Sequence, residues 1–125
     1  MPELDLPVVD ERTLDELMAA TGDDPGFVWE LVGTFLADTP AQVDAMTAAV
    51  EANDAAALVR PAHTLKSSSA TVGAMRLSSV ARELEMAARG GELEPRVRVT
   101  LGVAQTEWRT AAAAFAALLK RASGE

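Results

Sequence analysis

Residues 54–73 read DAAALVRPAHTLKSSSATVG and show most clearly that the chain is helical. Its apolar and small residues recur at alternating spacings of four and three, which is the repeat of one buried face of an α-helix. Asp54 is suited to cap the start of this helix, and Gly73 is a typical stop after its end. The pattern therefore predicts a helix over about residues 54–71, whose buried seam consists of Leu58, Ala62, Leu65, Ser69 and Val72.

The opposite face of this predicted helix carries the one histidine of the chain, His63. A helix turns by about 100° per residue, which places His63 about 140° from the centre of the seam, on the solvent side. Lys66 and Ser67 follow three and four residues later and share that face with Ala70. A neutral imidazole is a good nucleophile near pH 7, and an ammonium group can balance charge on phosphoryl oxygens. The face suits phosphoryl transfer, although an exposed histidine with a lysine at this spacing is commonplace by itself.

Helices are also predicted on both sides of this stretch, and no segment alternates for long enough to indicate a strand. The segment after Pro25 has a helical apolar pattern that continues past Pro40, a residue that would kink the helix or divide it in two. The last helix has the longest apolar seam, from Val97 to Leu118. We expect these helices near residues 11–21, from about residue 25 onward, over about residues 74–89 and from about residue 95 onward.

Long amphipathic helices joined by short loops predict an all-α fold, namely an antiparallel up-and-down four-helix bundle with a short extra N-terminal helix. The bundle is expected to form a single domain over residues 10–122. Residues 1–9 are expected to be a flexible N-terminal tail.

The charge of the chain is negative and unevenly distributed. The net charge is −8; residues 1–54 hold 13 acidic residues and one basic residue, whereas residues 55–125 hold 6 acidic and 10 basic residues. An acidic chain is a poor binder of nucleic acid, since phosphate backbones require a basic surface. The asymmetry would either steer a charged protein partner or be neutralised between the helices of the bundle, and we favour the second interpretation.

Composition and missing motifs exclude several other classes. No apolar run approaches the roughly 20 residues of a membrane span, and the N-terminus does not resemble a signal peptide. The chain contains no cysteine, which fits a cytoplasmic location. No Gly-rich phosphate loop, nucleophile elbow or calcium loop is found, and a single histidine makes a transition-metal site an unfavourable interpretation. We therefore expect no enzyme with its own ATP or hydrolytic site, and no cofactor or metal of its own.

The run from His63 to Ala74, HTLKSSSATVGA, resembles the signature of histidine-containing phosphotransfer (HPt) domains. That signature is usually written H-x-L-K-G-S-S, followed after three residues by G-A. Leu77 and the pair Leu84-Glu85 also fall where that family has them, and the resemblance extends over roughly residues 10 to 120.

The resemblance implies a four-helix bundle that carries a phosphate on an exposed histidine. His63 would be the phosphoacceptor, Lys66 would stabilise charge on the phosphoryl group, and Ser67 would permit close docking of the partner. Ala70, Val59 and Arg60 complete the expected docking surface. The expected partners are response-regulator receiver domains and a hybrid sensor kinase; the receiver domain would bring the aspartyl phosphate and the magnesium ion.

Two residues depart from the usual pattern. Ser67 stands where glycine is commonest, but serine is still small. Pro61 lies inside the predicted helix, where it removes one backbone hydrogen bond, so that it would bend the helix or mark a later helix start. We expect a tolerated local kink.

Three functions are compatible with these residues. The favoured one is a monomeric phosphorelay intermediate that accepts a phosphoryl group on His63 and passes it to another receiver. The second is an excised phosphotransfer domain of a larger sensor or chemotaxis-type kinase, which a chain that starts at Met1 and ends soon after its last helix makes less favourable. The third is a non-catalytic helical adaptor that binds a receiver domain, and it leaves the histidine unexplained.

Overall fold

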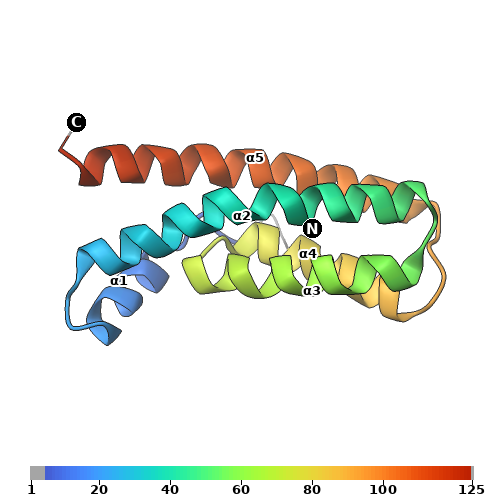
Figure 1. The fold of residues 1–125 in the computed structure, drawn as a ribbon, viewed down its shortest axis with the longest axis horizontal. Coiled ribbons are helices and arrows are strands. Elements are labelled where there is room, and N and C mark those ends of the chain that lie inside the picture. Colours follow the sequence, from blue (N-terminus) through green and yellow to red (C-terminus); the bar gives the residue numbers. More distant parts are fainter. Residues whose placement is uncertain (1–4, 125) are drawn as a thin grey trace.

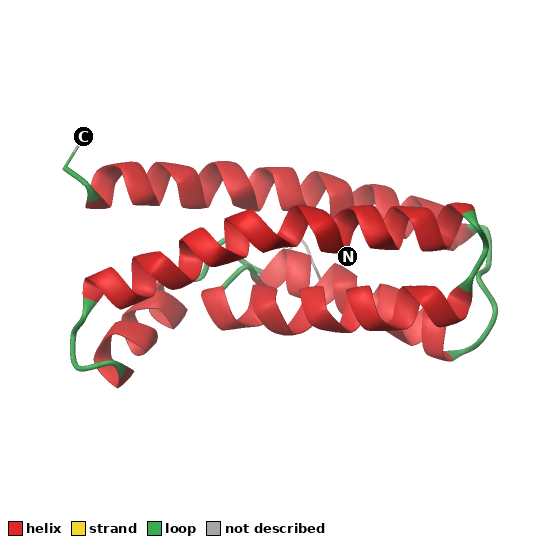
Figure 2. Cartoon of the chain, in the orientation of Figure 1, coloured by secondary structure: helices red, strands yellow, loops and turns green. Residues whose placement is uncertain are grey.

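The structure is a computed structural model that describes residues 5–124, and over that range it contains helices and no strand (Figure 2). Each helix of the sequence prediction is present. Their bounds are α1 Glu11–Ala20, α2 Pro25–Glu51, α3 Ala55–Val72, α4 Met75–Arg89 and α5 Arg96–Ala122. The predicted all-α fold class is therefore confirmed.

The four longer helices form a bundle in which consecutive helices run in opposite directions (Figure 1). Helix α3 packs between α2 and α4, and α5 closes the bundle by packing against both α4 and α2. Short loops join consecutive helices at alternate ends, which requires the antiparallel arrangement. Helix α1 lies at one end of the bundle, against α2 and α3 (Figure 1).

Aspartates begin three of the helices, because their carboxylates accept hydrogen bonds from backbone N–H groups that have no partner within the helix. Asp24 accepts from the N–H of Phe27 at 3.2 Å, and Asp54 accepts from the N–H of Ala57 at 3.0 Å. Asp10 caps α1 in a similar way. The start of the histidine-bearing helix is thus fixed locally by Asp54.

Two prolines lie inside helices without ending them. Helix α2 continues through Pro40 and is a single helix, and α3 continues through Pro61. Pro61 removes one helical hydrogen bond, but its side chain is buried in the bundle, and this packing offsets the loss. The alternatives of a divided second helix and of a later start for the third helix are therefore wrong.

A flexible tail is predicted over residues 1–9, of which residues 1–4 lie outside the described range. Residues 6–9 contact the bundle. The side chains of Val8 and Val9 pack on the hydrophobic core, and the Arg76 Nε donates to the Leu6 carbonyl oxygen at 2.6 Å. The two valine side chains and the Leu6 carbonyl oxygen meet partners that are distant in the sequence, and only the folded bundle brings these partners close.

Gly73 connects the end of α3 to the start of α1 through a backbone hydrogen bond. Its φ of 87° is left-handed, as a helix C-cap requires, and its carbonyl oxygen accepts from the Asp10 N–H at 2.7 Å. A Cβ at this position would lie 2.8 Å from the Asp10 carbonyl oxygen. Only glycine therefore fits here without a shift of the backbone.

The core follows the predicted seams. The residues of the α3 seam are all buried, and aromatic rings fill the centre between α2 and α5. Phe35 makes edge-to-face contacts with Trp108 and Phe115, with ring centroids 5.7 and 5.6 Å apart. No described helix combines the length and the apolar character needed to cross a lipid bilayer.

Candidate functional site

Helix α3 presents His63 on the side away from its buried seam, as the helical repeat predicts. The imidazole side chain is 53% exposed, whereas Ala62 and Leu65 beside it are fully buried. Because the packed seam fixes the rotation of α3, the histidine has a defined position and still faces the solvent.

Helix α4 supplies a carboxylate directly beside this histidine. The Nδ1 of His63 lies 3.0 Å from the Glu85 Oε2, and the Glu85 side chain is only 6% exposed. An ionised carboxylate can only accept a hydrogen bond, so Nδ1 is the nitrogen that carries the proton. The lone pair of the neutral ring is then on Nε2, for which no hydrogen bond is recorded within residues 5–124.

Two cations share the same carboxylate. The Lys66 Nζ lies 2.7 Å from the Glu85 Oε1, and Arg89 approaches Oε2 with Nη2 at 2.8 Å and Nε at 2.9 Å. The hydrogen bonds from Lys66 and then Arg89 do most to lower the pKa of Glu85, with a smaller contribution from His63, against the opposing effect of burial. The resulting pKa is about 2, so Glu85 is charged at neutral pH.

The other predicted site residues lie around this cluster. Arg60, Ser67 and Ala70 are exposed on α3, and Val59 is half-buried and packs against the core. The structure therefore brings His63 and Lys66 together through Glu85 and leaves small side chains on the accessible part of α3. The docking roles of these four residues stay predictions.

Glu85 and Arg89 are the site residues that sequence reasoning missed. Glu85 is a charged residue beside the buried seam of α4, and Arg89 follows it at the spacing that pairs side chains along a helix. These signals indicate an ion pair on α4, but they do not indicate which residue of another helix it meets. The contact with His63 joins residues 22 positions apart and depends on how α3 and α4 pack.

The helices that carry the site are also the basic part of the bundle. Only two acidic residues, Glu83 and Glu85, lie on α3 and α4, and five basic residues accompany them: Arg60, Lys66, Arg76, Arg82 and Arg89. The α3–α4 pair therefore carries a net positive charge, although Asp38 of α2 lies with Thr64 and Ser68 along the groove between α2 and α3.

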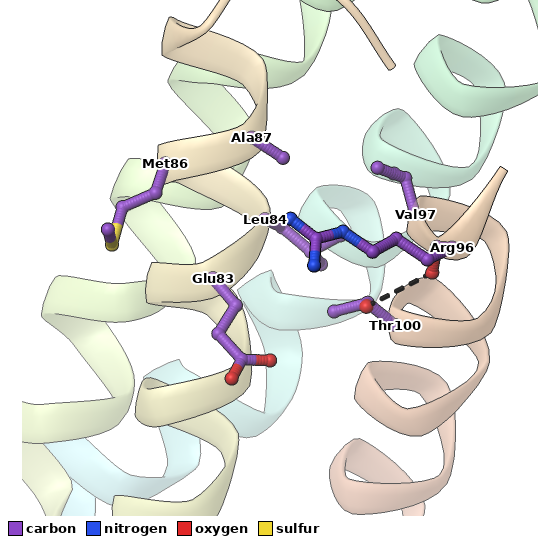
Figure 3. Close-up of a pocket in the computed structure, with 7 residues that line it drawn as sticks. All are labelled: Glu83, Leu84, Met86, Ala87, Arg96, Val97 and Thr100. Carbon is purple, nitrogen blue, oxygen red and sulfur yellow. Dashed lines mark hydrogen bonds between the residues drawn. The ribbon is translucent and has the colours of Figure 1, made fainter. Parts of the chain in front are cut away.

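Pockets elsewhere on the described surface do not include the histidine. A groove between α2 and α3 is lined by Phe35, Thr64 and Ser68, among others. A pocket of about 400 Å³ lies between α4 and α5, where the Arg96 side chain extends toward α4 (Figure 3). Its lining residues are Glu83, Leu84, Met86, Ala87, Arg96, Val97 and Thr100. The described residues contain no cluster of side chains suited to hold a metal ion.

Comparison with known proteins agrees with this geometry. The profile of the Hpt domain family matches residues 30–121. The crystal structure of histidine-containing phosphotransfer protein B (HptB) from Pseudomonas aeruginosa PAO1 is similar, with 31% sequence identity and a TM-score of 0.82. The match covers 92% of this chain and 96% of that protein. No curated protein matches the sequence.

Proposed function

Because this chain belongs to the Hpt domain family, we propose that it is a phosphoryl carrier of a two-component phosphorelay. It accepts a phosphoryl group on His63 from the aspartyl phosphate of a receiver domain and passes the group to another receiver. The observation that carries this proposal is the contact between the His63 Nδ1 and the Glu85 carboxylate, which leaves the nucleophilic Nε2 on the exposed side of α3.

In the accepting step the Nε2 lone pair attacks phosphorus. A nitrogen–phosphorus bond forms while the bond from phosphorus to the aspartyl oxygen breaks, and the aspartate leaves as a carboxylate. The Nδ1 proton stays on the ring, which therefore gains positive charge. Glu85 faces that charge and stabilises it, in the manner of the aspartate that orients a catalytic histidine in a hydrolase triad.

Lys66 is the second group of the proposed chemistry. It lies one helical turn after His63, and its side chain is 32% exposed on the same face. In the transition state it would neutralise charge on the phosphoryl oxygens. This carrier needs no ATP site, and the magnesium ion of the reaction belongs to the receiver domain.

The proposed docking surface surrounds the histidine. Ser67 and Ala70 are small and exposed, so a receiver active site can close over Nε2, while Val59 and Arg60 extend the contact along α3. The partners would be receiver domains and a hybrid sensor kinase, met by a cytoplasmic monomer. The basic α3–α4 surface supports association with an anionic, phosphorylated site.

The test is transfer of labelled phosphate from a phosphorylated receiver domain. We expect label that survives alkali, is lost in acid and is absent from the His63→Gln variant. The Gln variant should keep the helical content and thermal stability of the wild type, since His63 is exposed. Binding of receivers without any transfer of label would contradict the proposal and favour a non-catalytic adaptor.

A further inference from the structure

The Glu85 carboxylate has more positive partners than its charge requires. One carboxylate faces two cations, Lys66 and Arg89, in addition to the His63 N–H. The contacts are divided between its oxygens. Oε2 receives His63 and both nitrogens of Arg89, whereas Lys66 contacts Oε1. Departure of Lys66 would thus leave the hydrogen bonds at Oε2 intact.

The two cations differ in how they reach the carboxylate. Arg89 lies four residues after Glu85 on the same helix and directs two nitrogens, Nη2 and Nε, at the single oxygen Oε2. Lys66 extends from the other helix as a compact charge on a flexible stem and contacts Oε1. Lys66 also shares a face with the ring that receives the phosphoryl group, so it is the cation placed to transfer to that group.

Phosphorylation changes the charge that the site must balance. A phosphoryl group brings about one and a half to two negative charges at pH 7, so a cation is then needed near Nε2. A nearly buried carboxylate is costly to leave without a cation. Without Arg89 the carboxylate would have only Lys66 and the ring N–H as partners, and it would hold Lys66 more strongly.

We propose that Arg89 is a positioning residue that holds the Glu85 carboxylate, so that Lys66 can leave this carboxylate for the phosphoryl group on His63. The inference rests on the proposed function and adds an exchange of partners to it. Before phosphorylation Lys66 binds Glu85; afterwards Lys66 binds the phosphoryl oxygens while Arg89 and the ring N–H stay on Oε2.

The experiment follows the phosphoryl group itself. His63 is phosphorylated with phosphoramidate, which needs no protein partner, and the pH midpoint of the second phosphoryl protonation is measured by ³¹P NMR. An ammonium group close to the phosphoryl group lowers this midpoint. We expect Arg89→Gln to raise it by about one pH unit, the effect of losing a nearby opposite charge. Arg89→Lys should remain close to wild type, because a cation on Glu85 is retained.

Two comparisons separate exchange from simpler explanations. Glu85→Gln releases Lys66 whether or not Arg89 is present, so adding Arg89→Gln to this variant should leave the midpoint nearly unchanged. Arg82→Gln removes a charge from the exposed surface of the same helix, and we expect it to have little effect. The circular dichroism spectrum of each variant verifies its fold.

Three results would contradict the proposed role of Arg89. An unchanged midpoint in Arg89→Gln would overturn the inference. An equal rise of the midpoint in the Glu85→Gln background would also overturn it, since Arg89 would then act on the phosphoryl group directly. If neither phosphoramidate nor any phosphorylated receiver labels His63, the proposed function fails, and the inference fails with it.

Discussion

Replacing Glu85 with glutamine is expected to slow phosphoryl transfer to His63 about tenfold. The variant keeps the size of the side chain and one oxygen that can accept from Nδ1, but it removes the negative charge that faces the ring at 3.0 Å. As the nitrogen–phosphorus bond forms, the ring becomes positive, so the lost charge matters most in the transition state.

The magnitude follows from the kind of hydrogen bond that is lost. A hydrogen bond to a charged group contributes about 1.5–3 kcal/mol, and a bond between neutral groups contributes about 0.5–1.5 kcal/mol. The difference is about 1–1.5 kcal/mol, and about 1.4 kcal/mol corresponds to a tenfold change in rate. Because the His63 side chain is 53% exposed, water screens the charge and keeps the effect within this range.

The assay is single-turnover transfer from a phosphorylated receiver, at a receiver concentration that saturates the carrier. Glu83→Gln is the matched control, since it removes an exposed carboxylate two residues earlier on α4. Nitrogen NMR of the His63 ring should also show that Glu85→Gln lowers the fraction of the form with its proton on Nδ1. An unchanged rate together with unchanged ring nitrogen signals would refute the assignment of Glu85 as the group that orients His63.

The remaining predictions concern stability and access. The pKa of Glu85 is about 2 in the folded chain, below its ordinary value of 4.5, so its contribution to stability is present above pH 4.5 and is lost as pH falls toward 2; acid titration of the unfolding free energy should show a smaller loss in Glu85→Gln than in wild type. Gly73→Ala should destabilise the fold by about 1–3 kcal/mol in urea denaturation, because of its left-handed φ and the close Asp10 carbonyl oxygen. Gly102→Ala, inside α5 with open space around it, should instead stabilise the fold by about 0.5–1 kcal/mol, and a loss of stability would contradict this reasoning. Ser67→Gly should preserve transfer, whereas Ser67→Phe should lower it by about 100-fold through misplacement of the receiver and leave labelling by phosphoramidate intact; equal loss with both donors would indicate a disturbed histidine instead of blocked docking.

The parts of the fold that depend on neighbouring residues could be predicted from the sequence. Asp54, the α3 seam and Gly73 act within a few turns of one helix, so their pattern determines where α3 begins, which face it buries and where it ends. The same reasoning places His63 and Lys66 on one exposed face. The effect of Pro61 on α3 could not be derived from the local pattern, since whether a proline is tolerated inside a helix depends on the tertiary surfaces that bury it.

The electrostatics of the site depend on contacts between helices. The sequence gives the spacing of Glu85 and Arg89, but the rotation of α4 against α3 decides that their carboxylate and guanidinium groups meet His63 and Lys66. The contacts of residues 6–9 with the bundle have the same origin, because Leu6 and Arg76 are 70 positions apart. Local periodicity predicts which face of a helix is exposed, but it does not predict which side chains of another helix contact that face.

The arrangement of the site explains how a phosphoryl carrier can work without a deep active site. Receiving and returning a phosphoryl group both require that the same nitrogen be exposed, which excludes the enclosure that enzymes use to orient a reacting group. Here the orientation comes from behind the ring, where a nearly buried carboxylate holds Nδ1 and two cations hold the carboxylate. In the proposed function the exposed side of the ring stays open to successive receiver partners, which would supply the metal and the remaining catalytic groups. A rigid pair of helices is sufficient for this task, because it fixes the reactive nitrogen without covering it.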